Sequence, residues 1–192
     1  MNAKSTSLKA KLRNMAEEKK LSPQVLLQNY MFERFLERLS MSGYKDKFVI
    51  KGGMLIAAIV GVETRSTMDL DLSVKTYPIN AEHIKSAIEK ICSIEVTDGV
   101  FFSLERIVQI RLDSVYGGIR ASLKAVYDSI IVNMSVDFTS GDAITPSAVR
   151  YGFKTLFGEN DEIALWAYNI ETILAHLSAN LSKNSKNLPI FS

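Results

Sequence analysis

Near the N-terminus, apolar residues recur at the spacing of a helix. Leu8, Leu12 and Met15 recur at intervals of four and three, which predicts one apolar face of an amphipathic helix over residues 7–19. Ser22-Pro23 then places an N-cap residue before a proline at the first helical position, where the missing N–H costs nothing. We therefore expect two helices, the second ending near residue 40, before the first strand.

The hydrophobic period changes beyond a Gly-Gly pair. Residues 48–50 are a short strand candidate, Gly52-Gly53 predicts a sharp turn, and the apolar run over residues 54–60 predicts a buried helix. Residues 68–74 read Met-Asp-Leu-Asp-Leu-Ser-Val and alternate strictly. Because side chains alternate across a strand, Asp69 and Asp71 should project from one face while the apolar residues pack on the other.

The rest of the chain contains both helical and strand patterns of apolar residues. The patterns predict a helix over 80–91, strands over 101–107, 119–127 and 129–138, a short helix over 151–157, a short strand or loop over 163–168, and a helix over 170–181. The Ser-, Asn- and Lys-rich tail that follows Ala175 is expected to be frayed beyond its first turn or two. No internal repeat interrupts this order.

Composition places the chain among globular proteins. With 192 residues, 47% hydrophobic and 23% charged, it has the material for one domain with a core. No apolar run approaches the roughly 20 residues that cross a bilayer, and the N-terminus lacks the apolar stretch of a signal peptide. We therefore expect a cytoplasmic protein without a membrane partner. Two histidines and one cysteine argue against a His/Cys zinc site.

Positive charge gathers at the front of the chain. Residues 1–47 hold ten Lys and Arg against five Asp and Glu. Such a segment could contact nucleic acid or an acidic partner, but a helix rich in Lys and Glu is more often a solvated surface. Because residues 4–20 lack interleaved aromatic side chains, a nucleic-acid-binding module ranks last among the functional hypotheses.

The paired aspartates point to metal-assisted phosphoryl chemistry. Carboxylates at i and i+2 of a strand, with a third such as Asp137 from a neighbouring strand, can hold Mg²⁺ against phosphate groups. Gly52-Gly53 before a helix offers backbone N–H groups and the positive end of the helix dipole to a triphosphate. Each feature has an ordinary structural alternative: a turn, a solvated strand face, or, for Asp137, a turn cap shared with Asp142.

The order of these features resembles a known family. Lys51-Gly52-Gly53-Met54-Leu55, followed by Arg65-Ser66-Thr67-Met68-Asp69-Leu70-Asp71, is similar to the first motif of the AbiEii family of nucleotidyltransferase-like toxins. The resemblance extends over residues 21–37, 136–146 and 168–175. It implies an α/β nucleotidyltransferase-like core with a mixed sheet flanked by helices and preceded by two N-terminal helices.

The resemblance also implies roles for individual residues. Asp69 and Asp71 would bind Mg²⁺ and, with Asp137, form the catalytic carboxylate set. Gly52 and Gly53 would cradle the triphosphate, and Arg65 and Thr67 would brace the loop or contact phosphate. The implied partners are an NTP, an acceptor that is a tRNA end in some relatives, and the antitoxin of a toxin–antitoxin or phage-defence system.

The sequence departs from the family pattern after Ala175. Relatives continue with Glu-Lys and, some twenty residues later, a charged helical stretch, whereas this chain continues with His176 and Leu177 and stops at Ser192. We therefore expect a helical segment (1–47), a nucleotidyltransferase-like core (48–175) and an atypical, poorly ordered tail (176–192), the family's C-terminal helical region being largely lost by truncation. Two functions remain open: a Mg²⁺-dependent nucleotidyltransferase toxin, and a truncated, non-catalytic remnant that retains NTP or antitoxin binding.

Overall fold

The computed structural model describes residues 3–60, 69–75, 77–110, 117–140, 143–158 and 162–185. The helices in this part of the chain are α1 (Ala3–Lys19), α2 (Pro23–Met41), α3 (Gly52–Val60), α4 (Ala81–Cys92) and α5 (Ile170–Ser185). The strands are β1 (Phe48–Lys51), β2 (Asp69–Val74), β3 (Val100–Ile110), β4 (Gly118–Tyr127), β5 (Ile130–Thr139), β6 (Val149–Lys154) and β7 (Glu162–Ala167).

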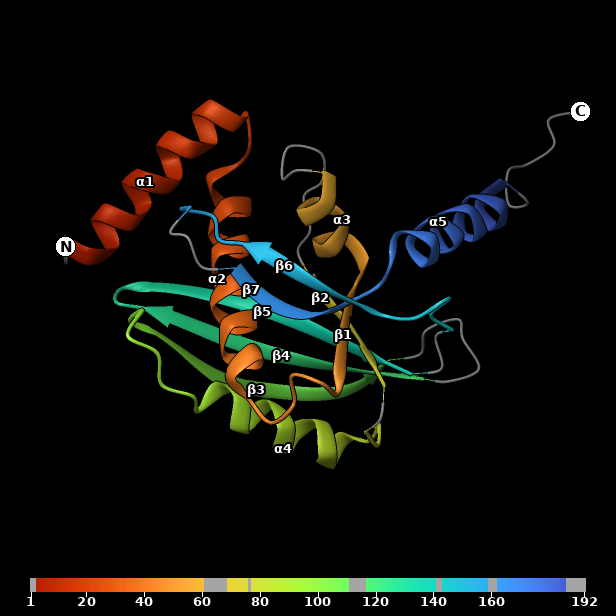
Figure 1. Ribbon diagram of the computed structural model, residues 1–192. Coiled ribbons are helices and arrows are strands. Elements are labelled where there is room, and N and C mark those ends of the chain that lie inside the picture. The colour runs from red at the N-terminus through yellow and green to blue at the C-terminus, as the bar shows by residue number, and fades with distance from the viewer. Residues whose placement is uncertain are drawn as a thin grey trace, which may run out of the picture.

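The strands form one seven-stranded mixed sheet in the order β3-β4-β5-β2-β1-β7-β6. The pairs β2–β5 and β1–β7 are parallel, and the other four neighbouring pairs are antiparallel. In Figure 1, α3 and α4 lie on opposite sides of this sheet, α1 and α2 lie toward one end and α5 extends away at the other. The α/β architecture, the mixed sheet and the two N-terminal helices expected from the sequence are confirmed.

Helix α2 supplies much of the core that supports the sheet. Its N-cap is Ser22, whose side chain accepts a hydrogen bond from the Gln24 N–H at 3.2 Å, as the Ser-Pro pair predicts. Phe32, Phe35 and Leu36 are fully buried in one hydrophobic cluster with residues of the strands. Burial of each such side chain stabilises the folded state by roughly 1.5–3 kcal/mol. Helix α2 is therefore a substantial part of the hydrophobic core.

A buried arginine joins α2 to the segment that leads into β3. Arg38 is 1% exposed, and its guanidinium makes two hydrogen bonds to Asp98, at 2.8 and 2.9 Å, and a third to the Val100 carbonyl oxygen at 2.6 Å. A buried guanidinium needs such partners because an unpaired charge in the core is strongly unfavourable. This contact fixes the start of the outermost strand, β3.

One prediction on the C-terminal half needs correction. Residues 151–157 do not form a short helix, because residues 149–154 form β6 at the edge of the sheet, paired antiparallel with β7. Tyr151 and Phe153 alternate onto one face, with ring centroids 4.8 Å apart, which is the period of a strand. The helix predicted over 170–181 is present as α5, whose helical backbone ends at Ser185.

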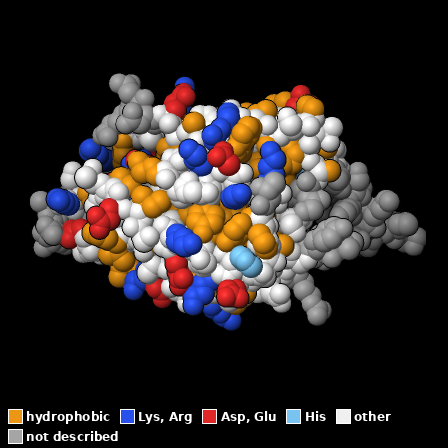
Figure 2. Space-filling model, turned by 60° about the horizontal axis from the view of Figure 1, so that its bottom comes forward, with side chains coloured by type: hydrophobic (Ala, Val, Ile, Leu, Met, Phe, Trp, Pro, Cys, Tyr) orange, Lys and Arg blue, Asp and Glu red, His pale blue; other side chains and the backbone are white. Residues whose placement is uncertain are grey.

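The surface is mixed in charge. On the face that Figure 2 turns forward, Lys, Arg, Asp and Glu side chains alternate with apolar patches, in keeping with a formal net charge of +2. Among the described helices, none is long and apolar enough to cross a bilayer.

Candidate active site

Four charged residues form a row across four neighbouring strands. Lys51 on β1 pairs in register with Asp71 on β2, Asp71 pairs with Asp137 on β5, and Asp137 pairs with Arg120 on β4. Residues in register share a face of the sheet, so the four side chains lie side by side with the two acids in the middle. We call these four residues the charged row.

The sequence of β2 explains why its acids are presented together. Leu70 and Leu72 are fully buried on one face of the strand, whereas Asp69 and Asp71 on the other face keep part of their surface exposed. Asp69 lies two residues before Asp71 and therefore beside the charged row. The structure thus brings Asp69, Asp71 and Asp137 to one face, as the alternation and the strand order required.

Arg120 holds Asp137 through both carboxylate oxygens. Its Nε and Nη2 donate to Asp137 at 2.7 Å each, and Nη2 lies 3.6 Å from an oxygen of Asp69. The hydrogen bonds to Asp137 raise the pKa of Arg120, which therefore stays charged. Asp137 is only 7% exposed, and the pairing with Arg120 compensates its buried charge.

Asp71 is the carboxylate that remains least compensated. Burial, followed by the negative charge of Asp137, raises the pKa of Asp71 to about 6. Lys51 and Arg120 oppose this shift and Asp69 adds to it. The Lys51 ammonium is itself directed to the Thr139 hydroxyl, to which it donates at 2.6 Å, and it lies 5.9 Å from the centre of the Tyr168 ring.

The glycine pair places the start of α3 directly against this carboxylate. Gly52 has a φ of +71°, which favours glycine, and a Cβ atom built on it would collide with the Asp71 carboxylate. Gly53 is the second residue of the helix, whose first turns expose backbone N–H groups. The predicted Gly-Gly turn thus coincides with the first two residues of the helix rather than forming a separate loop.

The donors present suit a hard cation. All three acids offer oxygen atoms, the ligands that Mg²⁺ prefers, and Mg²⁺ sites commonly use one or two carboxylates together with substrate phosphates. Within the part of the chain that the structure describes, no three His, Cys, Asp or Glu side chains gather closely enough to hold a metal ion by themselves. Because Arg120 occupies both oxygens of Asp137, Asp69 and Asp71 are the residues suited to such an ion.

Two predicted site residues cannot be placed. Arg65 and Thr67 lie outside the described residues, as does Asp142. Two further residues of the site carried no predicted role: Lys51, although it lies in the quoted motif, and Arg120. The signal for Arg120 is weak, because Arg120, Ser122 and Lys124 are simply the polar positions of an alternating strand. Only the pairing of β4 with β5 puts Arg120, rather than its neighbours, opposite Asp137.

Comparison with known proteins identifies a family. A model of the family described as "Nucleotidyl transferase AbiEii toxin, Type IV TA system" matches residues 34–179. This match includes the whole charged row and runs four residues past Ala175, and it begins at residue 34, within the segment 21–37 for which the sequence suggested a resemblance. A search of curated proteins gave no match.

Two similar solved structures come from Helicobacter pylori. JHP933 is 18% identical, with a TM-score of 0.48 over 81% of this chain and 56% of that protein. A candidate nucleotidyltransferase is 20% identical, with a TM-score of 0.44 over 81% of this chain and 58% of that protein. The chain therefore spans somewhat more than half the length of these proteins. Since the family model covers well over half of the sequence and every strand of the charged row, this chain belongs to the AbiEii nucleotidyl transferase toxin family.

Proposed function

We propose that this chain is a Mg²⁺-dependent nucleotidyltransferase that transfers a nucleotide from an NTP to an RNA acceptor, tRNA among the candidates, as the toxin of a toxin–antitoxin or phage-defence pair. One observation carries the proposal: the Asp71 carboxylate, flanked by Asp69 and Asp137, lies against the N-terminus of α3 at Gly52. Carboxylates beside a helix N-terminus form a place where a cation and a polyphosphate can be held together.

Different residues of the site would bind the metal ion and the phosphates. Asp69 and Asp71 would hold Mg²⁺, which when bound neutralises charge on the phosphates during transfer. The first N–H groups of α3, at Gly52 and Gly53, would receive phosphate oxygens. Family resemblance adds Arg65 and Thr67 to this phosphate site.

Arg120 and Asp137 would keep this arrangement rigid. The two hydrogen bonds between them fix the position of β4 against β5, and the 3.6 Å approach of Arg120 to Asp69 extends the link to β2. A planar guanidinium that binds a carboxylate through two bonds orients it more strictly than a lysine can. In this proposal Asp137 serves the reaction through position and charge.

The direct test is nucleotide transfer by the purified chain. Each α-labelled NTP is incubated with Mg²⁺ and total cellular RNA, using wild type, Asp69→Asn and Asp71→Asn. Glu95→Gln is the matched control, because Glu95 is an exposed acid outside the charged row. We expect label in RNA with wild type and Glu95→Gln, and a loss of at least about 100-fold in both aspartate variants.

The remaining outcomes separate the two candidate functions. The bidentate engagement of Asp137 by Arg120 supports the alternative of a chain that binds NTP without transferring it. Mg²⁺-dependent NTP binding in wild type, with no transfer to any RNA, would establish that alternative and refute the enzyme. If both aspartate variants keep wild-type affinity for Mg²⁺ and NTP, the assignment of the site itself is wrong.

The toxin role needs a separate measurement. Induced expression of the chain should slow bacterial growth, and Asp71→Asn should restore growth at equal protein level. If both versions inhibit growth equally, the inhibition does not come from this site.

A further inference from the structure

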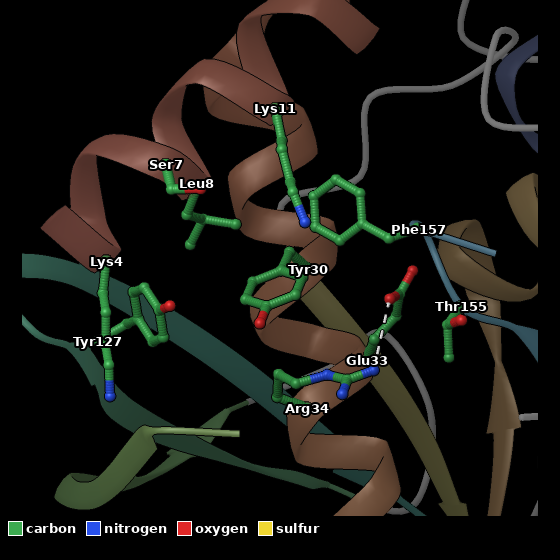
Figure 3. Close-up of a pocket in the computed structure, with 10 residues that line it drawn as sticks. All are labelled: Lys4, Ser7, Leu8, Lys11, Tyr30, Glu33, Arg34, Tyr127, Thr155 and Phe157. Atoms are coloured by element: carbon green, nitrogen blue, oxygen red, sulfur yellow. Dashed lines mark ion pairs between the residues drawn. The ribbon is translucent and has the colours of Figure 1, made fainter. Parts of the chain in front are cut away.

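A second pocket lies between the N-terminal helices and the strands, and it shares no residue with the charged row. It has a volume of about 370 Å³ and opens between α1, α2, the end of β4 and the segment that follows β6. In Figure 3 the side chains of Lys11, Phe157 and Tyr30 come together on one side of this space, and Lys4 and Tyr127 lie on the other. Its size is within the range of small-molecule sites in proteins.

Aromatic rings from distant parts of the chain meet in this pocket. Tyr30 of α2 and Phe157, which follows β6, have ring centroids 5.6 Å apart and planes inclined by 56°. Tyr127, at the end of β4, contributes a third ring to the lining (Figure 3). Planar apolar groups can pack against such rings, and nucleic-acid bases do so without regard to sequence.

Basic side chains surround the same rings. Lys11 Nζ lies 5.5 Å from the centre of the Phe157 ring, and Lys4 of the same helix lines the pocket. The Arg34 guanidinium lies 5.4 Å from the centre of the Tyr30 ring, but it is paired with Glu37 at 3.0 Å. Since neither Lys4 nor Lys11 forms an ion pair with any described residue, these two lysines leave net positive charge at the pocket.

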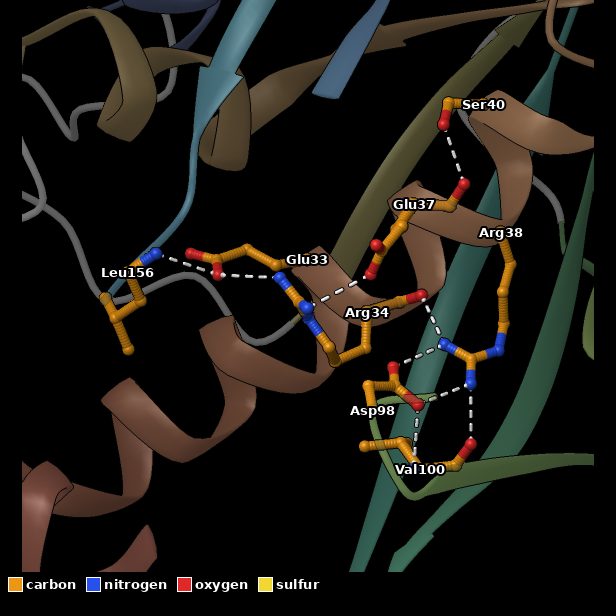
Figure 4. A network of polar contacts seen from close by, with 8 residues as sticks. All are labelled: Glu33, Arg34, Glu37, Arg38, Ser40, Asp98, Val100 and Leu156. Atoms are coloured by element: carbon orange, nitrogen blue, oxygen red, sulfur yellow. Dashed lines mark hydrogen bonds and ion pairs between the residues drawn. The ribbon is translucent and has the colours of Figure 1, made fainter. Parts of the chain in front are cut away.

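A buried carboxyl holds the segment that carries Phe157. Glu33 is 7% exposed, and its Oε2 accepts a hydrogen bond from the Leu156 N–H at 2.9 Å (Figure 4). Oε2 also lies 3.9 Å from Arg34, so the carboxyl links α2 to the connection after β6. This contact fixes the place of the Phe157 ring beside α1 in the absence of any ligand.

We propose that this pocket binds a nucleoside phosphate, with the base against Tyr30 and Phe157 and the phosphate at Lys11. Aromatic rings next to cations are the combination that recognises a stacked base with its phosphate. Helix α1 supplies only the cation, and the fold brings the aromatic rings to it from α2 and from the segment after β6. This site goes beyond the proposed function and does not depend on it.

The test measures binding in EDTA, where the proposed Mg²⁺ site is inactive. The probes are AMP and UMP by calorimetry and a labelled 12-nucleotide single-stranded RNA by anisotropy, at several salt concentrations. The variants are Phe157→Leu, which keeps apolar bulk without the ring, and Lys11→Gln. Lys9→Gln is the matched control, since Lys9 lies on the same helix but lines a different pocket.

We expect Phe157→Leu to weaken binding by at least about fivefold, because stacking of a base on a ring is lost. Lys11→Gln should weaken binding and lower the salt dependence by about one phosphate contact, while Lys9→Gln stays close to wild type. Binding of AMP or UMP identifies a free nucleotide as the ligand. Binding of the RNA alone, with the same variant pattern, identifies a unit of an RNA strand.

Three results would overturn the inference. Absence of binding by all probes at millimolar nucleotide and micromolar RNA excludes the site. Equal weakening by Lys9→Gln and Lys11→Gln, with Phe157→Leu unchanged, means that α1 attracts phosphate without a pocket. Loss of binding in Asp71→Asn, with the pocket variants unchanged, places the ligand at the charged row instead. A thermal melt of each variant confirms that it is folded.

Discussion

Replacing Asp71 with asparagine should stabilise the protein when no divalent cation is present. The substitution keeps the shape of the side chain and removes the charge that burial and Asp137 penalise. The pKa of Asp71 rises from an ordinary 3.8 to about 6. At about 1.36 kcal/mol for each pH unit, the fully charged side chain costs the folded state up to about 3 kcal/mol.

The direction of the pH dependence follows from this shift. Between about pH 4 and pH 6 the folded state binds the Asp71 proton more tightly than the unfolded chain does, so stability falls as pH rises through this range. Above pH 6 the loss is complete. Because Asp71 keeps some contact with solvent, screening lowers the expected gain of Asp71→Asn at pH 7.5 to about 2 kcal/mol, and at pH 4.5 the gain should be well under half as large.

Urea unfolding in EDTA at pH 4.5 and pH 7.5 measures the difference. Asp69→Asn is the matched control, because the Asp69 side chain is 45% exposed and its removal should change stability by about 0.5 kcal/mol or less. A gain for Asp71→Asn that is equal at the two pH values would refute the electrostatic explanation. A variant less stable than wild type at pH 7.5 would show that the carboxylate makes a contact that the asparagine cannot replace.

Three further substitutions test other contacts. Gly52→Ala should cost about 1–3 kcal/mol in urea unfolding, because its φ is +71° and the new Cβ meets the Asp71 carboxylate; unchanged stability would contradict that close approach. Burial raises the pKa of Glu33 to about 7, so stability falls from about pH 4.5 to pH 7, and Glu33→Gln should gain about 2 kcal/mol at pH 8 but little at pH 4.5. Arg38→Ala, which leaves Asp98 unpaired, should lower stability by about 3–5 kcal/mol, and a loss under 1 kcal/mol would show that water replaces the guanidinium.

Most of the fold could be predicted because local pattern and tertiary structure agree. The Ser22-Pro23 start of α2, the alternation of β2 and the helical period over 80–91 are local signals, and each element begins within a residue or two of its predicted position. The error at residues 151–157 has a physical cause. Gly152 weakens both a helix and a strand, and the alternating Tyr151 and Phe153 favour the strand, which pairing with β7 then completes.

In the candidate site too, some residues could be predicted from local pattern and others could not. Asp69 and Asp71 could be found from a single strand, because period two alone sets their common face. Asp137 required the parallel pairing of β2 with β5, and Arg120 required the register of β4 as well. The pairing of β2 with β5 is a long-range fact, because the register of strands separated by dozens of residues is decided by packing of the whole sheet. The register of β4 against β5 is instead set locally, because a tight turn joins Tyr127 to Ile130.

The charged row also explains why its electrostatic cost falls on one residue. Together with Asp69, which lies beside it, the charged row holds three acids and two cations, so these five side chains carry a formal charge of −1 when all are ionised. Asp137 is satisfied by two hydrogen bonds from Arg120, and Asp69 is partly solvated. Asp71 is left as the buried acid, with Lys51 drawn toward Thr139. A cation that binds beside Asp71 would therefore relieve the largest unfavourable interaction in the row. For that reason the loss of ligand binding and the gain of stability should appear together in Asp71→Asn.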